Sequence, residues 1–336
     1  MPQDIDYPFP PAPPRADELV DRLNARSLAW ATAHGLLTGA DARARYDAWD
    51  IAALSYYLFP SADEEGLQLY TDLLGYWFLL DDQFDGPLGA DPARAAAVGE
   101  ELIALLHLPA GAPVPDFPLA RAFGELWPRL RHGMSPSWCG RMTHLWERFY
   151  ASMAHEAVFR VERRPPTLDD FVELRRESGA MEMVVEMIDR IRGVELPASV
   201  RFSPLLQRLR GIAMDVPVWL NDVYTLEREE ARGDTANLVL VIEHQLACDR
   251  VRALDTAGGM ITGALEDYAE LSDQIPELAG LLGGVAALDE YVSVHLRTIM
   301  DGYYHWERRT IRYQRAHELP ADGPGYLEDL LASPVR

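Results

Sequence analysis

The sequence contains no lysine, only two cysteines and no long apolar run. Cys139 and Cys248 are too few for a disulfide framework and form no metal-type pair, so we expect both in the core. The apolar segment LLGYWFLL has 8 residues, whereas a helix that crosses a membrane needs roughly 20. We therefore expect no membrane insertion. Because the acidic, proline-rich start lacks the basic region of a signal peptide, we also expect a cytoplasmic protein.

Positive charge is scarce as well. All 31 basic residues are arginine, against 53 acidic residues, and the formal net charge is -22. Such a chain is a poor partner for nucleic acid or for an anionic membrane. Arginine's fixed charge and bidentate fork suit phosphate and carboxylate binding, although arginine-biased codon usage explains most of the 31.

Apolar residues recur at helical spacing along most of the 336 residues, and no alternating strand pattern is found. Six segments are predicted to be helical: 16–35, 61–85, 167–193, 203–233, 253–275 and 288–313. Ser61 and Thr167 are the expected N-caps of the second and third. The sequence therefore predicts an all-α protein. We expect a proline-rich arm, one large domain and a tail, at residues 1–15, 16–320 and 321–336.

Three carboxylates, Asp81, Asp82 and Asp85, directly follow the apolar run GYWFLL. Ionised carboxylates that are buried need a partner or a metal. On a helix Asp81 and Asp85 differ by about 40° and share a face, whereas Asp82 lies about 100° from Asp81. Clustered oxygens suit Mg²⁺, which substrate phosphates usually complete. Alone, this DDxxD pattern is weak: acidic clusters at helix ends are common in an acidic protein, and a solvated face is the default explanation.

A second stretch, NDVYTLERE, strengthens the metal hypothesis. Asn221, Thr225 and Glu229 are spaced four residues apart, so an amide oxygen, a hydroxyl and a carboxylate share one helix face. Helix capping would explain one such residue but not three at this spacing behind the apolar run VPVWL. The two stretches together predict two sets of oxygen ligands for divalent metal.

Together these motifs resemble those of the bacterial class I terpene cyclases. In that family DDxxD and NDxx(S/T)xx(K/R)E stand on opposing helices around a deep central cavity in one helical bundle. Here Arg228 fills the basic position of the second motif, and the resemblance covers roughly residues 5 to 320. It implies Mg²⁺-dependent ionisation and cyclisation of a linear isoprenyl diphosphate. The expected substrate is farnesyl diphosphate and the expected products are a cyclic sesquiterpene hydrocarbon or alcohol and free diphosphate.

The resemblance also implies roles for individual residues. Three Mg²⁺ ions would be held by these ligands: Asp81, Asp85, Asn221, Thr225 and Glu229. The substrate diphosphate would be bound by these side chains: Arg175, Arg228, Arg312 and Tyr313. Arg175, 46 residues before Asn221, matches the family's diphosphate-sensing arginine, and Ser178 and Gly179 match its linker and effector at a helix break. Ser178 is a departure, because that position often holds an acidic residue or another small polar one.

An allylic cation must be shielded from water, and an aromatic face can stabilise it by roughly 0.5–2 kcal/mol. Phe78 lies about 60° around the helix from Asp81, and Trp306 precedes Arg312 by six residues. We expect these two aromatic side chains to line the cavity. Ordinary core packing accounts for most of the other aromatic residues.

Four alternatives stay open. A C20 substrate would make the protein a diterpene cyclase, and a C10 substrate is also conceivable. A chain-elongating prenyltransferase would carry a second aspartate-rich motif and usually lysines, which this chain lacks. A non-catalytic helical binding protein would place both acidic motifs on its surface. Homodimers are common among such cyclases, so a second copy of the chain is a candidate partner.

Overall fold

The computed structural model describes residues 7–109, 111–282, 286–313 and 327–331. Within these residues every regular element is a helix and no β-strand is present, so the all-α prediction is confirmed. The first residues of the expected N-terminal arm and most of the expected tail lie outside the described part. Within the described part, no helix combines the length and the apolar character that crossing a membrane requires.

The chain forms two compact units. Unit 1 comprises Met1–Pro13, Tyr57–Phe59 and Pro165–Arg309, and unit 2 comprises Pro14–Tyr56, Pro60–Arg164 and Thr310–Arg336. The helices of unit 1 are α8 (Leu168–Ser178), α9 (Met181–Arg192), α10 (Ala198–Arg201), α11 (Pro204–Arg232), α12 (Leu238–Leu246), α13 (Arg250–Ser272), α14 (Ile275–Leu281), α15 (Ala286–Glu290), the π-helix η3 (Tyr291–Leu296) and α16 (Arg297–Glu307). Those of unit 2 are α1 (Asp17–Ala33), α2 (Ala40–Ala48), α3 (Ile51–Leu58, whose end belongs to unit 1), α4 (Glu64–Phe84), α5 (Pro92–Leu106), α6 (Pro118–Arg131), α7 (Pro136–Glu162) and the short 3₁₀ helices η2 (Pro87–Ala90) and η4 (Ile311–Tyr313).

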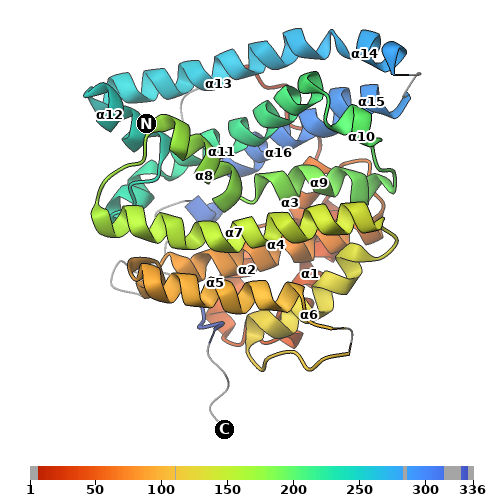
Figure 1. Cartoon of the computed structure of the whole chain (residues 1–336). Coiled ribbons are helices and arrows are strands. Elements are labelled where there is room, and N and C mark those ends of the chain that lie inside the picture. Colours follow the sequence, from red (N-terminus) through yellow and green to blue (C-terminus); the bar gives the residue numbers. More distant parts are fainter. Residues whose placement is uncertain (1–6, 110, 283–285, 314–326, 332–336) are drawn as a thin grey trace. The chain divides into compact units, whose positions relative to one another are not determined.

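Unit 1 is organised around α11, which packs against α8, α9, α12, α13 and α16 (Figure 1). Ser203 is the N-cap of this helix, and its hydroxyl accepts a hydrogen bond from the Leu206 amide. Pro204 fits the first turn because no amide hydrogen is needed there. Gly233 ends the helix in the left-handed conformation. The 29 residues of α11 extend about 44 Å, long enough to bury one stretch and carry the NDVYTLERE motif beyond it.

In unit 2, α4 is packed tightly because one of its residues is glycine. Tyr46 on α2 places its hydroxyl where a β-carbon of Gly75 would stand, only 2.0 Å from that position. On another side of α4, Tyr76 meets Phe123 of α6 and Trp146 of α7, with ring centroids 5.7 and 5.9 Å apart. These aromatic pairs form the core that fixes α4.

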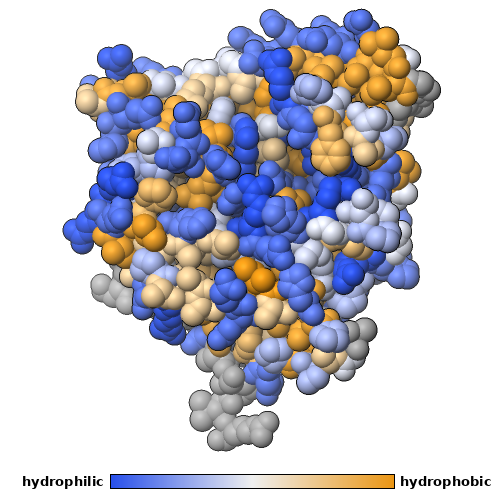
Figure 2. All heavy atoms as spheres, in the orientation of Figure 1, coloured by the Kyte–Doolittle hydropathy of each residue, from blue (hydrophilic) through white to orange (hydrophobic). Residues whose placement is uncertain are grey.

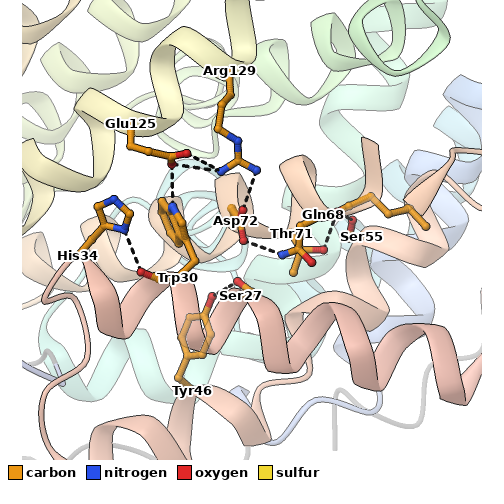
Figure 3. Close-up of polar contacts among 11 residues, drawn as sticks. Ser27, Trp30, His34, Tyr46, Ser55, Gln68, Thr71, Asp72, Glu125 and Arg129 are labelled. Carbon is orange, nitrogen blue, oxygen red and sulfur yellow. Dashed lines mark hydrogen bonds and ion pairs between the residues drawn. The ribbon is translucent and has the colours of Figure 1, made fainter. Parts of the chain in front are cut away.

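A polar network also anchors α4 (Figure 3). Arg129 on α6 donates to Asp72 on α4 at 3.0 Å and to Glu125 at 3.1 Å. Glu125 in turn accepts from the Trp30 indole of α1 at 2.7 Å. Burial raises the pKa of Asp72, and the Arg129 guanidinium opposes that rise. Because α1, α4 and α6 share this network, it holds α4 in place against the other two helices.

Three local predictions have a clear outcome. The Thr167 hydroxyl accepts from the Asp170 amide, so the predicted cap of α8 is confirmed. The prediction that Ser61 caps α4 is wrong. The N-cap is Asp63, two residues later, whose carboxylate accepts a hydrogen bond from the Gly66 amide. Cys139 and Cys248 are free, as the absence of a disulfide framework predicts, but their predicted place in the core is wrong, because both are partly exposed. On the face shown in Figure 2 hydrophilic side chains predominate, with an apolar group over α14, where Leu281 is largely exposed.

Candidate active site

The carboxylates at the end of α4 form a compact oxygen cluster. Ligand oxygens of Asp81, Asp82 and Asp85 all lie within 4.8 Å of one another. Burial, with the charges of Asp85 and Asp82, raises the pKa of Asp81 well above its usual range. Among the described residues Asp81 has no hydrogen-bond or ion-pair partner. A divalent cation would relieve this repulsion, so the donor set fits Mg²⁺.

Asp82 has a different environment from Asp81. Its carboxylate is buried and accepts two hydrogen bonds from Arg312, at 2.7 Å from Nη2 and 3.2 Å from Nη1. The guanidinium carbon of Arg312 lies 4.3 Å from the ring centre of Trp49 and 4.9 Å from that of Phe78. The predicted cavity residue Phe78 therefore packs against a predicted diphosphate ligand. Tyr313 follows Arg312 in η4 and is half-buried.

The second motif lies in unit 1, on α11. The Thr225 hydroxyl donates to Glu229 Oε1 at 2.7 Å, which confirms that the spacing puts them on one face. Asn237, the N-cap of α12, donates to the other Glu229 oxygen at 2.9 Å. Arg228 is half-buried beside Glu229. The oxygen ligands of this motif are therefore held by neighbours before any metal arrives.

Arg175 connects α8 to the start of this motif. Its Nη2 donates to Asn221 Oδ1 at 3.0 Å and its Nε to Asp222 Oδ1 at 2.9 Å. The second Asp222 oxygen accepts from the Leu238 amide at 2.9 Å. Burial raises the pKa of Asp222 to about 7, and the Arg175 guanidinium opposes the rise. The predicted diphosphate sensor thus contacts a predicted metal ligand directly.

The helix break predicted at Ser178 and Gly179 is present. Helix α8 ends at Ser178, α9 begins at Met181, and Ala180 between them has φ 56°. Gly179 itself has φ -77°, so it is required for space rather than for conformation. A β-carbon there would lie 2.7 Å from Val218 Cγ1 and 2.8 Å from the Arg175 carbonyl oxygen. The Ser178 hydroxyl is buried and has no hydrogen-bond partner within the described chain.

Sequence reasoning missed Glu307 altogether. This residue ends α16, is 5% exposed, and accepts a hydrogen bond at 2.9 Å from the amide nitrogen of Asn221. Burial raises the pKa of Glu307 well above its usual range, and the bond from Asn221 opposes this. Trp306, the preceding residue, is buried. No local pattern marks Glu307, because its partner is 86 residues away in the chain.

The predicted residues therefore fall into two groups. Unit 1 brings Arg175, Asn221, Thr225 and Glu229 together; unit 2 brings Asp81, Asp85, Phe78 and Arg312 together. A cavity of about 820 Å³ in unit 2 lies among α5, α6 and α7, with Phe123 and Trp127 in its wall. Its lining, taken over the described residues, includes none of the predicted site residues.

The comparison with known proteins decides the family. Residues 72–267 match the family described as terpene synthase family 2, C-terminal metal binding. The chain belongs to this terpene synthase family. It is 33% identical to (-)-beta-caryophyllene synthase ((2E,6E)-farnesyl diphosphate cyclizing) of Saccharothrix espanaensis, covering 93% of this chain and 90% of that protein. It is 31% identical to pentalenene synthase of Streptomyces arenae, covering 98% of each chain.

Among solved structures, this terpene synthase resembles germacradien-4-ol synthase from Streptomyces citricolor with a TM-score of 0.80. The two chains are 30% identical over 92% of this chain and 100% of the other. The predicted family and the predicted fold class are therefore confirmed. The family is metal-binding, and the Asp81, Asp82 and Asp85 cluster supplies suitable ligands.

Proposed function

We propose that this terpene synthase cyclises farnesyl diphosphate to a sesquiterpene hydrocarbon or alcohol and releases diphosphate. One observation carries the proposal: Arg175, the predicted diphosphate sensor, lies 3.0 Å from the amide oxygen of Asn221, a predicted metal ligand. Because the two side chains are neighbours, a metal bound by Asn221 and a diphosphate bound by Arg175 would lie side by side. The related (-)-beta-caryophyllene synthase, which by its name cyclises (2E,6E)-farnesyl diphosphate, supports the substrate.

Asp81 and Asp85, together with Asn221, Thr225 and Glu229, would hold Mg²⁺, with three ions in all. When bound, these ions supply positive charge that stabilises the departing diphosphate. They also explain how a chain of net charge -22 accepts an anionic substrate, because bound cations reverse the sign of the local field.

The chain's own residues then bind the diphosphate and protect the cation. Arg175, Arg228 and Arg312 would donate charge-assisted hydrogen bonds to diphosphate oxygens, and Tyr313 would donate through its hydroxyl. Phe78 and Trp306 would present ring faces to the hydrocarbon and help to exclude water. Ser178 and Gly179 would link the movement of Arg175 to the helix break. No protein nucleophile is needed.

The test is direct. The purified protein is incubated with geranyl, farnesyl and geranylgeranyl diphosphate and Mg²⁺, and the extracts are analysed by gas chromatography with mass detection. We expect a cyclic C15 product from farnesyl diphosphate and none when EDTA is present. A cyclic product from the C20 substrate alone would favour the diterpene cyclase, and a longer diphosphate would identify a prenyltransferase. A folded protein that converts none of the three would refute the proposal.

Two further expectations belong to this proposal. Residues 16–320 would act as one catalytic domain, which a chain trimmed to these residues would test by its retained turnover. The protein would form a homodimer, which light scattering during size-exclusion chromatography would test.

A further inference from the structure

Glu307 makes a contact that bears on the orientation of a metal ligand. The side-chain amide of asparagine has two unlike ends, an oxygen that accepts and an NH₂ group that donates. Only the oxygen can bind a hard cation such as Mg²⁺. A half-turn about the last side-chain bond exchanges the ends, so Asn221 is a useful ligand only if something fixes its amide.

The structure contains two partners that fix it. Glu307 Oε1 accepts from Asn221 Nδ2 at 2.9 Å, and Arg175 Nη2 donates to Asn221 Oδ1 at 3.0 Å. In the reversed orientation the NH₂ group would face the guanidinium and the oxygen would face the carboxylate. Both contacts would then be repulsive, so only one orientation is compatible with these neighbours.

The two partners are not equivalent once a metal binds. Arg175 occupies the same oxygen that a metal would use, so its contact competes with metal binding. Glu307 holds the opposite end of the amide and leaves the oxygen accessible. The hydrogen bond from Asn221 to Glu307 can therefore be present both with and without a bound metal.

Glu307 itself has little other reason to be buried. It is 5% exposed, and within the described part of the chain its one side-chain hydrogen bond goes to Asn221, while Oε2 has no partner. Burying a carboxyl group with an unmet oxygen destabilises a fold. An apolar residue at the end of α16 would be expected if stability alone mattered.

We propose that Glu307 is a positioning residue, which accepts from Asn221 Nδ2 and so directs Asn221 Oδ1 to the metal. This inference rests on the proposed function, because it takes Asn221 to be a metal ligand. What the role requires is a hydrogen-bond acceptor at position 307, not a charge. Glutamine should therefore replace Glu307, whereas methionine, of similar length and without a comparable acceptor, should not.

The experiment measures how much Mg²⁺ is needed for inorganic diphosphate to raise the melting temperature of the full chain. We expect Glu307→Met to raise the half-maximal Mg²⁺ concentration about 10- to 100-fold, the usual effect of losing a residue that orients a metal ligand. Glu307→Gln should stay within about threefold of wild type. Asp301→Asn is the matched control: Asp301 lies on the same helix, is largely buried and pairs with Arg297 instead. It should leave the Mg²⁺ requirement unchanged.

The outcomes separate the two proposals. If wild type shows no Mg²⁺-dependent stabilisation by diphosphate, the proposed function fails and this inference fails with it. If wild type responds and Glu307→Met responds equally, only the positioning role is overturned. The positioning role is also overturned if Glu307→Gln raises the half-maximal Mg²⁺ concentration as much as Glu307→Met does. Such a result would assign a direct role to the carboxylate.

A second pair of variants keeps the test valid if Glu307→Met does not fold. Asn221→Asp offers an oxygen at both ends but faces Glu307 with like charge. Adding Glu307→Gln supplies a donor to that carboxylate and should lower the Mg²⁺ requirement relative to Asn221→Asp alone. An unchanged or higher requirement in the double variant would refute the proposal.

Discussion

The ion pair between Asp82 and Arg312 should dominate the stability of the end of α4. Both side chains are buried, and the guanidinium makes two hydrogen bonds to the carboxylate while lying between two aromatic rings. Removing one partner of such a pair leaves a buried charge uncompensated and typically destabilises a protein by about 3–5 kcal/mol. Here Asp81 and the rings of Trp49 and Phe78 still stabilise the cation. We therefore expect Asp82→Asn to lie at the low end, at about 3 kcal/mol.

This magnitude corresponds to a factor of about 150 in the folding equilibrium, which urea unfolding followed by circular dichroism measures easily. Removing both charged groups should be far less harmful than the single changes predict. A buried ion pair that is replaced by apolar residues of similar size is often neutral in stability. The variant Asp82→Leu with Arg312→Met should accordingly recover at least about 2 kcal/mol relative to the sum of the two single variants.

Additive losses in the double variant would refute this reasoning, as would a loss below about 1 kcal/mol for Asp82→Asn, which is the range of exposed pairs. The matched control is the exposed carboxylate of Glu64, which pairs with Arg22 and Arg26. Glu64→Gln should leave the urea unfolding midpoint close to that of wild type.

Three further predictions concern unit 1. Gly179→Ala should destabilise the protein by about 1–3 kcal/mol in urea unfolding and weaken Mg²⁺-dependent diphosphate binding, because the new β-carbon would overlap Val218. The control is Gly263→Ala, where the new β-carbon would meet open space; it should be neutral or slightly stabilising. Burial raises the pKa of Asp301 to about 6, so between pH 4 and 6 the folded state keeps a proton that the unfolded chain releases, and stability falls as the pH rises. Asp301→Asn should therefore reduce the loss of unfolding free energy between pH 4.5 and 6.5, and a loss as steep as in wild type would contradict the assignment. Thr167→Ala should cost about 1 kcal/mol in urea unfolding, since it removes the cap of α8; an unchanged midpoint would show that the cap adds nothing.

The sequence predicted what depends on local pattern. Helical spacing located α1, α4, α11 and α13 but missed α7, although that helix has 27 residues. It also put Thr225 and Glu229 on one face, where they form a hydrogen bond. Cap chemistry was right at Thr167 but wrong at Ser61, because Asp63 stands nearer the helix and offers an equally good acceptor. Where several capping residues are close together, the sequence does not decide which of them begins the helix.

Partners that are distant in the chain could not be predicted. Glu307 meets Asn221 only because α16 packs on α11, and helical spacing within either segment does not reveal this. The position of the helix break was predicted, but its cause was not. The strained residue is Ala180, and Gly179 is needed because Val218 lies close to it. Such steric demands appear only when neighbouring helices are in place.

The two motifs share a design that their first two residues reveal. In each, the first residue, Asp81 or Asn221, is a predicted metal ligand. The second residue is buried and binds an arginine: Asp82 binds Arg312, and Asp222 binds Arg175. Successive residues on a helix point about 100° apart, so one can face a metal while the next faces the protein.

This arrangement explains how arginines serve an anionic substrate in an acidic protein. A buried carboxylate keeps each guanidinium ordered and largely neutralised while no substrate is present, so neither arginine remains as an isolated buried charge. Metal ions bound to the first residue of each motif would then add the positive charge that a diphosphate requires. The two adjacent residues of DD and of ND thus have separate roles: the first would bind metal and the second binds an arginine. The second of them, holding the arginine, accounts for a carboxylate that metal binding alone would not require.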